Sequence, residues 1–225
     1  MIWKILALLA CLSSPSSLSQ FFQGMLKERN PRKIALKAIT INLLVYVLIL
    51  AIIYAWNSKI FKLVELFSLP YSSEGIFCLL GAVALGPILI LVEAMIGVIA
   101  LRLKNPTLKF RVEISSGWAT MPMGGIFLSL LLVILEEITF RGLWIGLLGL
   151  IGVSPIGSIL ISSGFYGINH INFGKNAPFQ KFFTGILLGT LYIIFGLLPC
   201  IMAHLCQNLV LAWLGKKKSK GGDER

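Results

Sequence analysis

The sequence has little charge, and acidic residues are the scarcest part of it. Only 13% of its 225 residues are charged and only nine are acidic, whereas 57% are hydrophobic. A soluble domain carries about 25% charged residues, so this chain cannot cover the surface of a water-soluble globule of its size. Disorder is excluded too, because disordered chains are poor in apolar residues. Four cysteines are too few for a disulfide scaffold, and the 22 glycines follow no collagen triplet.

Long apolar runs take up most of the chain instead. Because about 20 apolar residues cross a bilayer as one helix, the runs predict an all-α, polytopic integral membrane bundle of about six transmembrane helices. The predicted spans are residues 38–56, 75–101, 123–150, 155–173, 179–197 and 198–214. We expect the fourth helix to continue past His170 to about residue 173, and the loop 174–178 to dip into the bundle.

The basic residues lie in short clusters beside the apolar runs. Twenty Lys and Arg against nine acidic residues leave a net charge of +11, but this charge is not spread as a nucleic-acid-binding surface, and no nucleic-acid partner is expected. Short basic clusters beside spans are typical of cytoplasmic loops, so we expect a multi-pass protein with both termini in the cytoplasm. The clusters are Lys27, Arg29, Arg32, Lys33 and Lys37; Arg102, Lys104, Lys109 and Arg111; and Lys216, Lys217, Lys218 and Lys220.

These features divide the chain into four parts. We expect an N-terminal cytoplasmic or interfacial segment at 1–37, two spans with their loops at 38–122, a core at 123–214 and a basic tail at 215–225. Residues 1–12 are compatible with a cleaved signal, an interfacial helix or an extra span. The interfacial helix is favoured, because the apolar stretch is too short to span and cleavage there would export a basic cluster.

Ionisable residues lie midway along the third apolar run. Charge at membrane depth costs at least about 2.5–3.5 kcal/mol, so such residues usually face a cavity and have a function. At about 100° per residue, Glu137 and Arg141 share one helix face while Glu136 points elsewhere. Arg141 can therefore neutralise Glu137 and leave Glu136 available as a general base. The alternative is a purely structural ion pair between helices.

Both histidines of the chain also lie in apolar runs, each with a partner four residues away. Tyr166 precedes His170, and Asn208 follows His204. Either histidine alone would more often be an ordinary core residue. Two histidines with one or two glutamates in a helix bundle, however, match the ligands of a hydrolytic zinc site, and Asn208 adds a neutral donor for an oxyanion.

In this order and spacing, the motifs resemble the CPBP family of intramembrane proteases. That family includes the type II CAAX prenyl endopeptidases and the bacterial Abi proteins. One position departs from the family pattern, because a tyrosine stands where the family usually has phenylalanine. The positions that carry the resemblance are Glu136, Glu137, Arg141, Tyr166, His170, His204 and Asn208.

The resemblance implies a CAAX protease-like hydrolase, an intramembrane metalloendopeptidase that cuts a membrane-associated peptide or protein. Glu136 would activate the attacking water, assisted by Glu137 and its pairing with Arg141. Two mechanisms stay open. In one, Zn²⁺ or another divalent metal is bound by His170, His204 and Glu136; in the other, a metal-independent glutamate mechanism uses the histidines to position the water. In both, Asn208 would stabilise the oxyanion.

Two other functions remain as alternatives. A catalytically silent protein of the same fold could act as a binding, immunity or scaffold protein in the membrane. A proton- or ion-coupled transporter is less favoured, because the sequence shows no inverted repeat with matched broken helices. Glu93, inside the second predicted span, is one further acidic residue that could face either the cavity or a headgroup.

Overall fold

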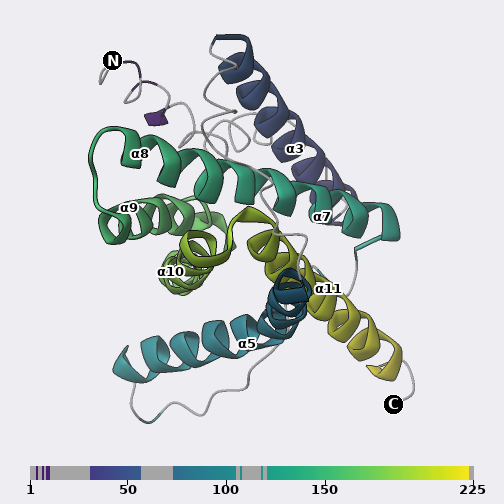
Figure 1. The fold of residues 1–225 in the computed structure, drawn as a ribbon. Coiled ribbons are helices and arrows are strands. Elements are labelled where there is room, and N and C mark those ends of the chain that lie inside the picture. Colours follow the sequence, from purple (N-terminus) through teal and green to yellow (C-terminus); the bar gives the residue numbers. More distant parts are fainter. Residues whose placement is uncertain are drawn as a thin grey trace.

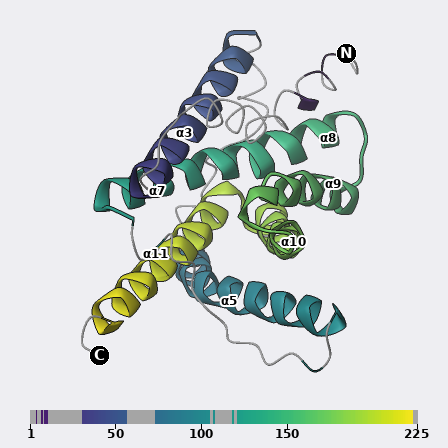
Figure 2. The same ribbon diagram turned by 180° about the vertical axis from the view of Figure 1, so that it is seen from behind.

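Every element of the structure, a computed structural model, is helical (Figures 1 and 2). It describes residues 4, 7, 9, 10, 31–56, 73–104, 107, 118 and 121–222, and this part of the chain contains no strand. The prediction of an all-α fold is confirmed. The elements are α3 (Pro31–Trp56), α5 (Ser73–Lys104), α7 (Met123–Glu137), the π-helix η1 (Ile138–Ile145), α8 (Gly146–Leu150), α9 (Pro155–Ile168), the 3-10 helix η2 (Ile171–Phe173), α10 (Ala177–Phe195) and α11 (Leu197–Gly222).

Five of the helical segments are long and apolar enough to cross a membrane. They cover Lys33–Ala55, Gly75–Lys104, Met123–Leu150, Ala177–Phe195 and Leu197–Lys217. The fourth predicted span, residues 155–173, corresponds to α9, which is apolar but only 14 residues long. Most of the predicted N-terminal interfacial helix, and residues 223–225 of the predicted basic tail, lie outside the described residues.

The expectation that the fourth helix continues past His170 is wrong. The α-helix ends at Ile168, and the His170 N–H donates to the carbonyl three residues back, that of Gly167. The chain then makes a single 3-10 turn and leaves it at Gly174, whose φ of 118° favours glycine. Of the loop 174–178 that was expected to dip into the bundle, Gly174 and Lys175 are exposed, whereas residues 176–178 are half-buried or buried where α10 begins.

The third span forms the axis of the molecule. In Figures 1 and 2, α7, η1 and α8 form one continuous helix, with α3 on one side and α9, α10 and α11 on the other. One apolar core joins α3 to this axis and to α9 through residues that include Tyr46, Phe140 and Tyr166. A second core joins α5, α10 and α11 through residues that include Leu89 and Leu188. Tyr166 belongs to the first core, and Ala203, next to His204, belongs to the second.

The contact between α5 and α11 depends on Gly86. A Cβ at this position would lie 2.6 Å from the Cβ of Cys206 and 2.8 Å from the backbone nitrogen of Gln207. Both distances are shorter than real Cβ contacts, and one involves backbone that cannot rotate away. The two helices can therefore approach this closely only with glycine here.

We expect Gly86→Ala to lower the unfolding free energy by about 1–3 kcal/mol, as overpacking usually does. The thermal unfolding midpoint in detergent measures this effect. Gly81→Ala on the same helix is the matched control, because a Cβ there meets nothing within 4 Å. The same unfolding midpoint for both variants would contradict the close approach.

Candidate active site

The third span changes its winding where its polar residues lie. Glu137 is the last residue of α7, and the next eight residues form the π-helix η1, which carries Arg141. The Ser162 hydroxyl on α9 donates to the carbonyl of Phe140 inside this segment, which satisfies a carbonyl in the irregular stretch. Short π-helical stretches inside α-helices occur frequently at functional sites. The sequence analysis assumed α-helical winding throughout, and no residue pattern indicated the change.

Glu137 and Arg141 form the predicted ion pair. Arg141 Nη1 lies 3.1 Å from Glu137 Oε1, and both side chains are at most 1% exposed. The guanidinium carbon of Arg141 also lies 4.3 Å from the centre of the Tyr166 ring. Arg141 is thus held between a carboxylate and an aromatic face, so its charge is compensated without water.

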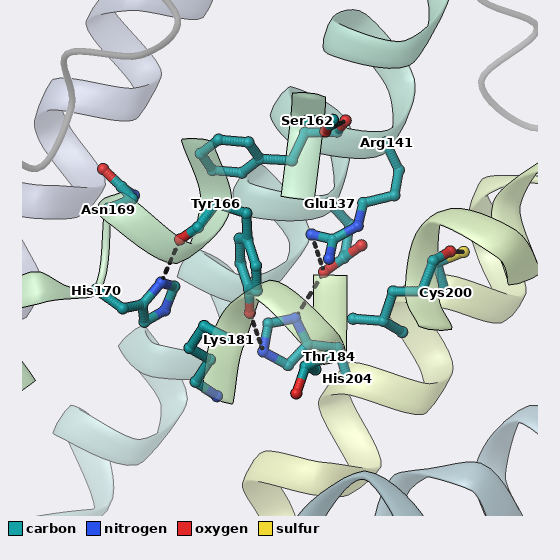
Figure 3. Close-up of polar contacts among 12 residues, drawn as sticks. Glu137, Arg141, Ser162, Tyr166, Asn169, His170, Lys181, Thr184, Cys200 and His204 are labelled. Carbon is teal, nitrogen blue, oxygen red and sulfur yellow. Dashed lines mark hydrogen bonds and ion pairs between the residues drawn. The ribbon is translucent and has the colours of Figure 1, made fainter. Parts of the chain in front are cut away.

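The carboxylate of Glu137 also binds His204, a contact that the sequence analysis missed. His204 Nδ1 lies 2.7 Å from the same oxygen, Oε1, that Arg141 contacts (Figure 3). Because a carboxylate oxygen accepts, Nδ1 carries the hydrogen and the imidazole is fixed in orientation. Its other nitrogen, Nε2, lies 3.5 Å from the Tyr166 hydroxyl. Glu137 therefore connects the third span to α11.

His170 is held on the other side of Tyr166. Its Nδ1 donates to the Tyr166 carbonyl over 2.8 Å, which leaves Nε2 with the lone pair. The His170 and Tyr166 ring centroids are 4.6 Å apart in an edge-to-face arrangement, and those of His204 and Tyr166 are 6.2 Å apart. The structure thus brings both histidines to one buried tyrosine, at the position where the resemblance showed its one departure.

Glu136 is the carboxylate that the network leaves unpaired. It is 8% exposed, and the described residues make no hydrogen bond to it. It directly precedes Glu137, the carboxylate that Arg141 and His204 bind. A buried carboxylate without a hydrogen-bond partner, beside a second one whose Oε1 is bound by Arg141 and His204, is an arrangement that suits a general base.

Asn208 is the least connected of the predicted residues. It lies one turn after His204 on α11 and is half-buried, but within the described part of the chain it makes no hydrogen bond to the other candidates. Its neighbour Gln207 is fully buried, and neither polar atom of its amide has a hydrogen-bond partner among the described residues. The sequence analysis did not single out Gln207.

A second polar cluster lies between α5 and α10 and includes Glu93. Lys181 Nζ lies 2.7 Å from Glu93 Oε1, and the Thr184 hydroxyl donates to the same oxygen over 2.8 Å. The Gln180 amide donates to the backbone carbonyl of Glu93 over 2.9 Å. The signal for it was present, since polar residues at 180, 181 and 184 lie on one face of an apolar helix.

The candidate metal ligands do not form a recognisable ligand set. Among the described residues there is no group of three or more His, Cys, Asp or Glu that could hold a metal ion. The Nδ1 atoms of His204 and His170 are bound to Glu137 and to a backbone carbonyl, and Nε2 of His204 faces a hydroxyl group. The described residues therefore do not present the three protein ligands that a catalytic zinc ion requires.

Comparison with known proteins identifies a family for the part of the chain that carries the site. The family model described as Type II CAAX prenyl endopeptidase Rce1-like matches residues 118–210. No curated protein and no solved structure matches the chain. The matched residues run from before α7 into α11 and include both glutamates of the site, both histidines and Asn208. Residues 118–210 are therefore a domain of the Rce1-like type II CAAX prenyl endopeptidase (CPBP) family, which implies an intramembrane protease, a hydrolase that acts on a protein substrate.

Proposed function

We propose that the protein is an intramembrane endopeptidase in which Glu136 activates the attacking water. The observation that carries this proposal is the contrast between two adjacent buried carboxylates. Glu137 is bound by Arg141 and His204, whereas Glu136 is bound by no described residue. Because Arg141 neutralises Glu137, Glu136 stays available to take a proton as a base. A purely structural ion pair would not require this second carboxylate.

The proposed reaction is hydrolysis of a peptide bond with Glu136 as the proton carrier. Glu136 takes a proton from water as the water oxygen bonds to the peptide carbonyl carbon. When the carbon–nitrogen bond breaks, the same carboxyl group returns that proton to the leaving amine. The products are a new carboxyl terminus and a new amino terminus, and the general base is regenerated.

The remaining residues position the reactants. Nε2 of His170 carries a lone pair and can accept the second hydrogen of the attacking water. His204, oriented on Nδ1 by Glu137, limits how that water and the peptide can lie. The amide of Asn208, free of bonds to the other candidates, is available to donate to the oxyanion of the tetrahedral intermediate.

Of the two mechanisms that the resemblance implies, we favour the metal-independent one. The support is that no three His, Cys, Asp or Glu among the described residues are grouped so as to hold a metal ion, and that Nε2 of His204 faces the Tyr166 hydroxyl. A metalloendopeptidase with Zn²⁺ on His170, His204 and Glu136 would need these side chains to rearrange. The two mechanisms differ in what a chelator does.

Removal of divalent metals is therefore expected to leave the rate of hydrolysis within about twofold of the untreated enzyme, since no proposed step uses a metal. The measurement is peptide hydrolysis by purified protein after dialysis against 1,10-phenanthroline, with total metal determined by mass spectrometry. Loss of activity that returns on addition of Zn²⁺ would contradict the metal-independent mechanism.

The proposed substrate is a membrane-associated peptide or protein. The matched family is described as a CAAX prenyl endopeptidase, so a farnesylated peptide ending in a CAAX sequence is the first defined probe. We also propose that both termini are cytoplasmic, with the basic clusters on that side of the membrane. The scissile bond would then be reached from the cytoplasmic side.

The alternative is a silent binding or immunity protein with the same fold. Comparative proteomics separates it from a protease. Membranes that contain the wild-type protein are compared with membranes that contain Glu136→Gln at the same level, and new peptide termini are counted. An endopeptidase produces termini that are missing in the variant, while its uncut substrate accumulates there. A binding protein leaves the two sets of termini identical.

A further inference from the structure

Tyr46 lies on the first span, outside the matched family domain, yet its side chain reaches the candidate active site. It is 2% exposed, and its hydroxyl accepts a hydrogen bond over 2.8 Å from the side-chain amide of Asn169. A tyrosine remote in sequence thus makes a buried polar contact at the edge of the site.

The partner of Tyr46 lies where α9 stops. Asn169 is the residue that caps α9, and His170 follows it directly. The backbone of His170 has already left the α-helix, with φ −104° and ψ 11°. A side chain that anchors Asn169 therefore fixes the point at which the chain turns and, with it, the position of the His170 ring.

The ring of Tyr46 is held in place by packing in the core. It packs in the same buried core as Phe140 of the π-helix and as Tyr166, whose ring lies against His170. Because densely packed cores move little, the hydroxyl is held at a fixed place relative to the third span. The position of His170 relative to Tyr166 then depends on contacts from α3.

We propose that Tyr46 is a positioning residue that, through Asn169, holds the turn carrying His170 against Tyr166. The first span thereby completes the site of the 118–210 domain. The effect on catalysis rests on the proposed function, whereas the effect on His170 does not. The phenol of Tyr46 acts through another residue and is not itself assigned to the reacting atoms.

The test uses the fact that the chain has only two histidines. Protein with isotope-labelled histidine in nanodiscs gives two imidazole spin systems by NMR, and His204→Gln identifies which belongs to His170. Tyr46→Phe keeps the ring in the core and removes only the hydroxyl. We expect it to shift or broaden the His170 ring signals and to leave the His204 signals in place. Asn169→Ala, which removes the same bond from its other side, should move the same signals.

Ile53→Val is the packing control, because Ile53 lies on the same helix in the same core but makes no side-chain hydrogen bond. It should leave both histidine signals unchanged. Unchanged His170 signals in Tyr46→Phe would overturn the proposal, and so would an equal shift in Ile53→Val, because that shift would come from general loosening of α3.

A kinetic arm tests the consequence for catalysis with the farnesylated CAAX peptide. We expect Tyr46→Phe to lower kcat about tenfold with KM within about twofold, because a displaced positioning group affects the transition state more than binding. The Tyr46→Phe, Asn169→Ala double variant should be no slower than the slower single variant.

If wild-type protein does not cleave while the His170 signals still shift in Tyr46→Phe, the proposed function fails and the positioning role stands. If wild-type protein cleaves and His170 does not shift in Tyr46→Phe, the positioning role fails and the proposed function stands.

Discussion

Glu136→Gln is expected to abolish peptide hydrolysis and to leave the protein folded. Glutamine keeps the shape of the side chain but cannot take a proton from water, so the loss should reach about 100- to 10,000-fold, the usual contribution of a general base. Stability should change little, because the described residues make no hydrogen bond to Glu136. The measurements are kcat with the farnesylated CAAX peptide and the unfolding midpoint in the same detergent.

The control for this result is Gly81→Ala, purified in the same way. Its new methyl group meets nothing within 4 Å, so both its activity and its unfolding midpoint should match the wild-type protein. Near-normal hydrolysis by Glu136→Gln would contradict the catalytic assignment. A large fall in its unfolding midpoint would show instead that Glu136 has a structural role.

Arg141→Ala is expected to damage both folding and activity. It removes the guanidinium that is paired with Glu137 and stacked on Tyr166, and it leaves a carboxylate that is 0% exposed with His204 as its remaining partner. Breaking a buried pair from one side costs about 3–5 kcal/mol, because the remaining charge stays buried without compensation. The thermal unfolding midpoint and the yield of folded protein measure this loss.

A second variant separates charge from packing. In Arg141→Ala, Glu137→Gln the uncompensated carboxylate is gone, so part of the lost stability should return while hydrolysis stays impaired, because His204 loses its charged partner. An Arg141→Ala protein with an unchanged unfolding midpoint would show that the pair does not stabilise the fold.

The parts of the fold and site that depend on short sequence distances were predictable. Continuous apolar runs predict the spans directly. The third span begins at residue 123 and ends at residue 150, as expected. The pairing of Glu137 with Arg141 was also predictable, since residues four apart meet on one helix face. The brace of Tyr166 against His170 follows from the same spacing.

The contacts that depend on tertiary packing were not predictable. The bond between Glu137 and His204 joins residues 67 apart, and the one between Tyr46 and Asn169 joins residues 123 apart. No local pattern encodes which face of one helix meets which face of another. The early end of α9 was missed for a similar reason, because apolar residues continue beyond it and only backbone hydrogen bonds show where the helix stops.

The most direct test of the account is hydrolysis by the purified protein in nanodiscs, followed by mass spectrometry in water enriched in ¹⁸O. The probe is the farnesylated CAAX peptide, and Glu136→Gln is run beside the wild-type protein. The account predicts that wild-type protein, treated with chelator, releases a fragment whose new carboxyl group carries one ¹⁸O atom, and that the variant releases none. Equal release of this fragment by both proteins, or release by the wild-type protein only when metal is restored, would contradict water activation by Glu136 without a metal.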